Sequence, residues 1–330
     1  MDKKSVTLYL SSAGGMNALN VIDALGRSDI EFRIIGGDCD PLATGLFLVD
    51  KSYVVPRADD PKFISETIKI CKQENVDIAL PIYSADFPVF AKYKDEFQKE
   101  GIRTYAPSLD SWNICDDKYV VAEFLSSIGV PCPFTWTYDQ AIKYAAVLPY
   151  PVFMKLQSGS GTREVRIIRT KEELKIFADS RFVIQEYIEG KELTIDTFSD
   201  LGGKMLAASP RWRTKIYGGL SVRGETICDA EIVDFSRCIV EALKLPGPAN
   251  VQCKRQSDGG LKFYDVNPRF ASGGLPLAVA AGLNSPELLI RLLMGWKIPQ
   301  KIEIKEGIIM CRYWTTLFVQ REGDEYAIHI

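Results

Sequence analysis

The stretch "FYDVNPRFASGG", Phe263 to Gly274, places an acid, an amide and an arginine at alternate positions before a glycine-rich turn. Successive side chains of a β-strand point to opposite faces, so Asp265, Asn267 and Arg269 are expected on one face. Such a row is either the solvated face of an ordinary hairpin or one wall of a binding site. The sequence on its N-terminal side favours the binding site.

The preceding run "NVQCKRQSDGG" predicts a strand that pairs with this one around Asp258-Gly259. Asp-Gly is favoured in two-residue type I′ hairpin turns, and such a turn would place Gln252 directly opposite Asp265. The carboxylate and amide oxygens of Gln252, Asp265 and Asn267 suit Mg²⁺, which usually keeps waters and takes further ligands from phosphates. Because only one of the three is charged, we expect a nucleotide to complete the metal site.

A phosphate site is indicated in "PVFMKLQSGSGTREVRII", residues 151–168, which predicts a strand with Lys155 and then a small-residue loop. Glycine and serine let backbone N–H groups approach phosphate oxygens, and the lysine adds a positive charge. The lysine precedes the glycines, so this is not a Walker A loop. The alternative is a flexible hairpin tip. Next, "VIQEYIEGKELTID" carries Glu186 and Glu192, which are either surface glutamates or ligands of a nucleoside.

The composition excludes several classes of protein. The 330 residues are 46% apolar and 25% charged, enough for a sizeable core in more than one domain. A net charge of −3 gives no general attraction for nucleic acid or membrane, and no apolar run is long enough for a membrane span. Eight scattered cysteines predict reduced thiols in the cytoplasm. Because His329 is the only histidine, Ser-His, Cys-His and multi-histidine metal sites are nearly excluded.

The order of segments predicts the fold class. Residues 1–111 alternate strand-like and helix-like segments, as in a doubly wound parallel sheet. Within them, "GIRTYAPS" at 101–108 predicts another strand. Beyond them, Asp116 is expected to cap a helix that ends near Gly129. From Pro151 onward, short strands of period 2 predict antiparallel sheets. The expected class is therefore α/β, with an α+β second half.

Taken together and in this order, the segments resemble the ATP-grasp superfamily, most closely one synthetase unit of the carbamoyl-phosphate synthase large subunit. The resemblance rests on "DDK" at 116–118, the Lys155 strand with its glycine loop, "QEYIEGKE", and "NVQ" followed by "DVNPRF". It implies an ATP-grasp fold in three parts. These are a pre-ATP-grasp α/β domain at 1–111, a lid subdomain at 112–187, and a C-terminal subdomain at 188–330 with the metal site and a C-terminal extension.

The resemblance also implies roles for individual residues. Lys118 and Lys155 would contact the phosphates of ATP, and Ser158, Gly159, Ser160 and Gly161 would form the lid loop. The adenine pocket would be lined by Glu186, Tyr187 and Ile188, and Glu192 would bind the ribose. The metal ligands would be Gln252, Asp265 and Asn267. Arg269 would steady the transferred phosphoryl group. Asp265 departs from the family, which usually has glutamate there, and its shorter side chain reaches less far.

The resemblance implies that ATP, with Mg²⁺ or alternatively Mn²⁺, phosphorylates a carboxylate to an acyl phosphate that an amine attacks. Arg211 and Arg213 in "SPRWRTKIYGG" suit a carboxylic acid bidentately, unless they belong to an exposed basic strand. We expect a stand-alone carboxylate-amine ligase for a small acid, with an amino acid as one option. Its partners would be small molecules, not nucleic acid or membrane, and a homodimer is left open.

Three other functions stay open at this point. A carbamoyl-phosphate-synthase-like enzyme would activate bicarbonate or carbamate with ammonia. A non-catalytic nucleotide-binding protein would tolerate loss of the metal face. A nicotinamide oxidoreductase would explain the α/β start, although G-x-G-x-x-G is absent and the face of Gln252, Asp265 and Asn267 would have no role.

Overall fold

The N-terminal part of the protein is a parallel sheet with helices. The computed structural model describes residues 5–159, 164–323 and 325–328. The strands are β1 (Ser5–Ser11), β2 (Glu31–Asp38), β3 (Lys51–Val54) and β4 (Ile78–Leu80), in the order β3-β2-β1-β4. The helices are α1 (Met16–Leu25), η1 (Thr44–Phe47), α2 (Phe63–Gln73), α3 (Asp86–Lys92) and α4 (Lys94–Lys99). All neighbours in this sheet are parallel, and the strand order reverses beside β1, which confirms the doubly wound prediction.

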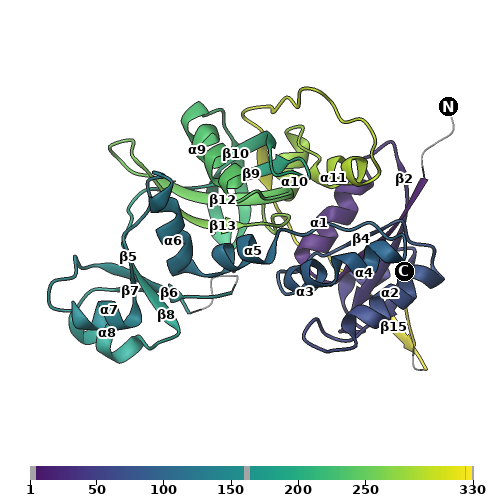
Figure 1. The fold of residues 1–330 in the computed structure, drawn as a ribbon, viewed down its shortest axis with the longest axis horizontal. Helices are drawn as coiled ribbons and strands as arrows, with labels where there is room; N and C mark the ends of the chain where they lie inside the picture. Colours follow the sequence, from purple (N-terminus) through teal and green to yellow (C-terminus); the bar gives the residue numbers. More distant parts are fainter. Residues whose placement is uncertain (1–4, 160–163, 324, 329–330) are drawn as a thin grey trace.

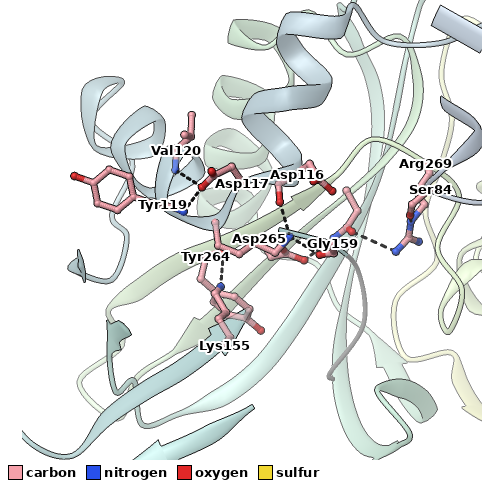
Figure 2. A network of polar contacts seen from close by, with 12 residues as sticks. Ser84, Asp116, Asp117, Tyr119, Val120, Lys155, Gly159, Tyr264, Asp265 and Arg269 are labelled. Atoms are coloured by element: carbon pink, nitrogen blue, oxygen red, sulfur yellow. Dashed lines mark hydrogen bonds and ion pairs between the residues drawn. The ribbon is translucent and has the colours of Figure 1, made fainter. Parts of the chain in front are cut away.

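Two details differ from the sequence-based expectation. The segment 101–108 forms no strand, since its only bridge pairs Arg103 with Ile78. Helix α5 (Leu109–Asp116) follows directly, and α6 (Lys118–Ser127) is capped by Asp117 rather than Asp116. The Asp117 Oδ1 atom accepts hydrogen bonds from the backbone N–H groups of Tyr119 and Val120 at 2.9 and 3.1 Å (Figure 2). These donors at the first helical turn have no intrahelical acceptor, so the side chain one residue before the helix satisfies them.

A small antiparallel sheet follows, at the lower left of Figure 1. Its strands are β5 (Thr135–Thr137), β6 (Val152–Leu156), β7 (Arg166–Ile168) and β8 (Phe182–Glu186), in the order β5-β8-β6-β7, with helices α7 (Tyr138–Lys143) and α8 (Lys171–Phe177). The two helices and the sheet share a separate apolar core around Leu174 and Ile184. Lys155 therefore stands on a strand of this sheet.

The largest sheet has six strands in the order β13-β12-β9-β10-β11-β14. They are β9 (Lys191–Ser199), β10 (Met205–Tyr217), β11 (Leu220–Thr226), β12 (Gly247–Arg255), β13 (Leu261–Asn267) and β14 (Ile309–Cys311). The remaining elements are α9 (Ala230–Ala242), α10 (Leu275–Ala280), α11 (Ser285–Leu293), β15 (Val319–Glu322) and β16 (Glu325–Ile328). All pairs in this and the smaller sheet are antiparallel, as predicted.

Two cores hold the site in place. One unites α5, α6, α9 and the six-stranded sheet, with Leu125 and Phe263 fully buried. The other joins the N-terminal sheet to α10 and α11 and includes Phe270, which follows the "NPR" sequence. The predicted boundary between residues 111 and 112 falls inside α5, which packs on β13 together with α6. None of the helices in the described part of the chain has the length and apolar character needed to cross a membrane.

The β12–β13 hairpin reaches the predicted register by a different route. Gln252 lies opposite Asp265, as predicted. The turn is not a two-residue turn, because Gln256 pairs with Gly260 around a three-residue connection in which Gly259 has a φ of +91°. Nearer the site, a bulge inserts Tyr264 into β13 and restores the Gln252–Asp265 pairing. The bulge also turns the Tyr264 and Asp265 side chains to the same side, where both line a cavity.

Candidate active site

A cavity of about 620 Å³ lies between the small sheet and the six-stranded sheet, and Tyr83, beyond the end of β4, also lines it. Every site residue predicted from the sequence that belongs to the described part of the chain lines this cavity: Lys118, Lys155, Ser158, Gly159, Glu186, Tyr187, Ile188, Glu192, Arg211, Arg213, Gln252, Asp265, Asn267 and Arg269. Ser160 and Gly161 lie outside the described residues. Segments far apart in sequence therefore meet here.

The predicted metal face contains a carboxylate oxygen without a hydrogen bond. Asp265 Oδ2 accepts a bond from Asn267 Nδ2 at 2.6 Å, whereas the buried Oδ1 has no hydrogen-bond partner among the described residues. Its closest charge is Lys118 Nζ at 3.5 Å. Within the described residues no group of three or more His, Cys, Asp or Glu could hold a metal ion. One open carboxylate oxygen beside the Gln252 amide fits a hard cation that takes its remaining ligands from phosphates.

The cations around Asp265 are arranged for an anionic ligand. Lys155 is 9% exposed, and its Nζ donates to the Tyr264 carbonyl at 3.3 Å (Figure 2). Burial lowers the pKa of Lys155 to about 8 from an ordinary 10.5, which the Asp265 carboxylate opposes and Lys118 reinforces. For Asp265, burial alone would raise the pKa, but Lys118, Lys155 and Arg269 outweigh it and leave the pKa below its ordinary value. The cluster thus has more cations than anions.

Lys118 connects three parts of the cavity wall. It is the first residue of α6, and its Nζ donates to the Gly159 carbonyl at 2.9 Å and to the Asp116 carbonyl at 3.3 Å. The Asp117 Oδ2 atom accepts from Gln157 Nε2 at 2.8 Å, which ties α6 to the end of β6. The "DDK" sequence therefore places its lysine over the glycine loop and the metal face, and Asp117 holds the helix that carries it.

Arg269 joins the metal face to the N-terminal part of the chain. Its Nε donates to Ser84 Oγ at 3.0 Å (Figure 2), and its Nη2 donates to Asn267 Oδ1 at 3.2 Å. Burial lowers the pKa of Arg269, against the attraction of Asp265, and the guanidinium stays charged because its ordinary pKa is so high. Ser84 escaped the sequence analysis, although its position after β4, at the carboxyl end of a parallel sheet, could have indicated it.

The two arginines of β10 have different hydrogen-bond partners. Arg211 is buried, and its Nε donates to Asp196 Oδ2 at 2.7 Å while Nη1 lies 3.4 Å from Ser221 Oγ. Arg213 contacts Glu192 through Nη1 and donates to the Gly219 carbonyl at 2.7 Å through Nη2. Arg213 therefore lies with Glu192, the residue predicted to bind the ribose, whereas Arg211 is held by Asp196 and Ser221.

The segment predicted to hold adenine is tied to neighbouring strands. Glu186 Oε2 accepts from Phe134 N at 3.1 Å and from Lys262 Nζ at 3.2 Å, so this carboxylate fixes the end of β8. Lys254 Nζ donates to the Ile188 carbonyl at 2.9 Å. Tyr187 and Ile188 lie between β8 and β9 and line the cavity.

Two acids near the N-terminus support the local backbone. Asp86 is buried and accepts bonds from the hydroxyls of Ser11 and Ser12 at 2.6 and 3.1 Å and from Tyr83 N at 3.0 Å. Asp38 accepts from Gly14 N at 2.8 Å. Neither acid lines the cavity. Asp86 shapes the loop that carries Tyr83 and Ser84.

Comparisons with known proteins match this arrangement. A family model described as "ATP-grasp in the biosynthetic pathway with Ter operon" matches residues 178–315, and one described as "PylC-like, N-terminal domain" matches residues 10–105. The carbamoyl phosphate synthase large chain of Clostridium botulinum is 21% identical over 301 residues, which is 85% of this chain and 27% of that protein. The chain thus spans about a quarter of the length of the curated relatives it matches.

Solved structures show the same fold. The biotin carboxylase-beta-gamma-ATP complex from Campylobacter jejuni superimposes with a TM-score of 0.73 and 18% identity, covering 92% of this chain and 75% of that one. The biotin carboxylase domain dimer of 2-oxoglutarate carboxylase from Hydrogenobacter thermophilus, in complex with MgADP, ADP and bicarbonate, gives a TM-score of 0.72 at 18% identity, with 92% and 74% coverage.

Proposed function

We propose that the chain is an ATP-grasp enzyme, an ATP-dependent, ADP-forming ligase that joins a small carboxylic acid to an amine, which the match of residues 178–315 to an ATP-grasp family model supports. A carboxylate oxygen of the acid attacks the γ-phosphorus of ATP, and ADP leaves. The amine nitrogen then attacks the acyl carbon. The bond from this carbon to the phosphorylated oxygen breaks, phosphate leaves with that oxygen, and the amine nitrogen loses a proton to solvent. The acyl phosphate is needed because phosphate is a far better leaving group than an oxide ion.

The observation that carries the proposal is the cationic cluster beside an open carboxylate oxygen. Lys118, Lys155 and Arg269 converge on Asp265, whose Oδ1 atom lacks a hydrogen bond. A triphosphate would supply the missing negative charge, and a divalent cation would supply the missing partner of Oδ1. Lys155 is costly to bury as a cation, and a buried charge of this kind is typical of a site that acts on an anion.

Each residue has a distinct proposed role in this reaction. Gln252, Asp265 and Asn267 would hold Mg²⁺, with Mn²⁺ as an alternative ion. When bound, the ion offsets negative charge on the transferred phosphoryl group. Lys155 and Lys118 bind phosphate oxygens, and Lys118 draws the backbone of Gly159 toward them. The apolar faces of Tyr187 and Ile188 receive adenine.

The carboxylic acid would bind between Arg211 and Arg269, at the end of the cavity away from the adenine segment. Arg211 Nη2 makes no hydrogen bond to the described residues, so this guanidinium keeps a donor for the substrate, with Ser221 beside it. Arg213, predicted as a second acid ligand, uses both terminal nitrogens in contacts within the protein. We therefore assign the acid to Arg211 and Arg269.

The proposal is tested by measuring ADP release with Mg²⁺ across a panel of carboxylic acids crossed with amines. We expect turnover that requires one acid and one amine. Arg211→Lys keeps the charge but loses the bidentate fork, and it should raise the KM for the acid more than the KM for ATP. Absence of ADP release and of nucleotide binding under all conditions would refute the proposal.

A second candidate is a carbamoyl-phosphate-synthase-like reaction, in which bicarbonate is the acid that ATP phosphorylates and ammonia is the amine. It is favoured by the match to the carbamoyl phosphate synthase large chain over 85% of this chain and by bicarbonate in the complex of the 2-oxoglutarate carboxylase domain. In the same panel, ADP release with bicarbonate and ammonia alone would support this candidate over the first.

A further inference from the structure

The two carboxylate oxygens of Glu192 are in different situations. Oε1 accepts a hydrogen bond from the Tyr264 hydroxyl at 2.8 Å and contacts Arg213 Nη1. Among the described residues, nothing donates to Oε2. The side chain is 23% exposed and lines the cavity. One oxygen is thus held by two protein donors while the other is left to a ligand.

The two donors are themselves fixed by the fold. Arg213 Nη2 donates to the Gly219 carbonyl at 2.7 Å, in the turn between β10 and β11 where Gly218 and Gly219 have φ angles of +54° and +79°. Tyr264 is the residue that the bulge inserts into β13. A tyrosine hydroxyl is protonated at neutral pH, so Tyr264 has a proton to donate to Glu192.

We infer that Tyr264 and Arg213 are positioning residues that hold Glu192 with Oε2 open to the ribose hydroxyls of the bound nucleotide. This rests on the proposed function, since it requires that the cavity bind a nucleotide. Because Tyr264 and Arg213 both hold Oε1, the Glu192 carboxylate cannot rotate away from the ribose. A nucleotide without ribose hydroxyls leaves Oε2 unpaired next to the ligand, and such a site rejects it. The cavity therefore selects ribonucleotides over dideoxyribonucleotides.

The test compares the binding of ADP and 2′,3′-dideoxyADP by calorimetry, with Mg²⁺ and without acid or amine. We expect the wild-type protein to prefer ADP by roughly tenfold or more, as for a hydrogen bond to a charged group. In Tyr264→Phe the preference should fall, because ADP binds more weakly while the affinity for 2′,3′-dideoxyADP hardly changes. Arg213→Lys, which removes the other donor, should act in the same direction.

Tyr53→Phe is the matched control. It also removes a tyrosine hydroxyl bonded to a glutamate, here Glu74 at 2.5 Å, but at a position that does not line the cavity. This variant should keep the wild-type preference. A purely structural role for Tyr264 would weaken both ligands equally, and that result would overturn the inference.

The remaining outcomes separate the inference from the proposed function. A wild-type protein that binds both nucleotides with the same affinity contradicts the role of Glu192 but leaves nucleotide binding intact. A folded wild-type protein that binds neither nucleotide contradicts the proposed function, and the inference falls with it. If Tyr264→Phe does not fold, the test rests on the ratio of the affinities of Arg213→Lys for ADP and 2′,3′-dideoxyADP. A ratio equal to that of the wild-type protein overturns the inference.

Discussion

Replacing Lys155 with methionine should stabilise the ligand-free protein and weaken nucleotide binding. Methionine has a similar length and no charge, so the variant removes the cost of burying an ammonium group. The pKa of Lys155 lies at about 8 instead of 10.5 because of burial. Each pKa unit corresponds to about 1.4 kcal/mol, so we expect Lys155→Met to gain up to about 3 kcal/mol at pH 7.

The lowered pKa of Lys155 also predicts how the stability difference between Lys155→Met and the wild-type protein changes with pH. Below pH 8 the Lys155 ammonium is charged in both the folded and the unfolded protein, and the folded state bears the full cost. Between about pH 8 and 10.5 the unfolded protein binds the additional proton, so the contribution of Lys155 to stability rises with pH. The stability difference between Lys155→Met and the wild-type protein should therefore shrink over this range.

Urea denaturation at several pH values measures both quantities, and calorimetry with ADP measures the functional cost. Loss of a charge-assisted contact to a phosphate should weaken ADP binding roughly tenfold to a hundredfold. Lys51→Met is the control, because Lys51 pairs with Glu74 at 2.6 Å and its pKa is raised by that bond, so this variant should be less stable. A Lys155→Met protein that is less stable than wild type at pH 7 and binds ADP equally well would refute the reasoning.

Three further predictions concern other parts of the molecule. The bond from Lys51 and further donors lower the pKa of Glu74 to about 2, so its stabilisation is present above pH 4.5 and lost toward pH 2. Glu74→Gln should lower the urea midpoint at pH 7, and the difference from wild type should diminish on acidification. Asp117→Ala should cost about 1 kcal/mol of unfolding free energy as a lost N-cap, whereas Asp116→Ala should cost less, and equal losses in urea denaturation would contradict this cap. A Cβ at Gly274 would lie 1.9 Å from Arg211 Nη2, so Gly274→Ala should raise the KM of the acid more than that of ATP in steady-state kinetics, and unchanged constants would count against the acid site.

Much of the fold could be predicted because strand periodicity and turn residues act locally. The parallel and antiparallel sheets follow from the spacing of apolar residues, and both were confirmed. The prediction of a strand at 101–108 was wrong. The same alternation of apolar and polar residues fits a strand and an extended segment with the single bridge at Arg103. The N-cap was predicted one residue too early. Asp116 and Asp117 are neighbours, and the sequence does not show that the helix begins at Lys118.

The site illustrates a harder case. The pairing of Gln252 with Asp265 was predicted from a two-residue turn, whereas the protein combines a longer turn with a bulge at Tyr264. The longer turn and the bulge together restore the predicted register. The bulge also has an effect of its own, because it brings the Tyr264 hydroxyl to Glu192. A bulge depends on how neighbouring strands pack, so no local pattern revealed it. Likewise, the sequence analysis gave Arg211 and Arg213 the same expected role and could not show that Arg211 pairs with Asp196 and Arg213 with Glu192.

The central claim is that this cavity binds a nucleotide through a divalent cation held at Asp265. The most direct measurement is a calorimetric titration of ADP with and without Mg²⁺, on the wild-type protein and on Asp265→Asn. We predict that Mg²⁺ strengthens ADP binding to the wild-type protein and has little effect on the variant. ADP that fails to bind the wild-type protein, or that binds both proteins equally with and without Mg²⁺, would contradict the account.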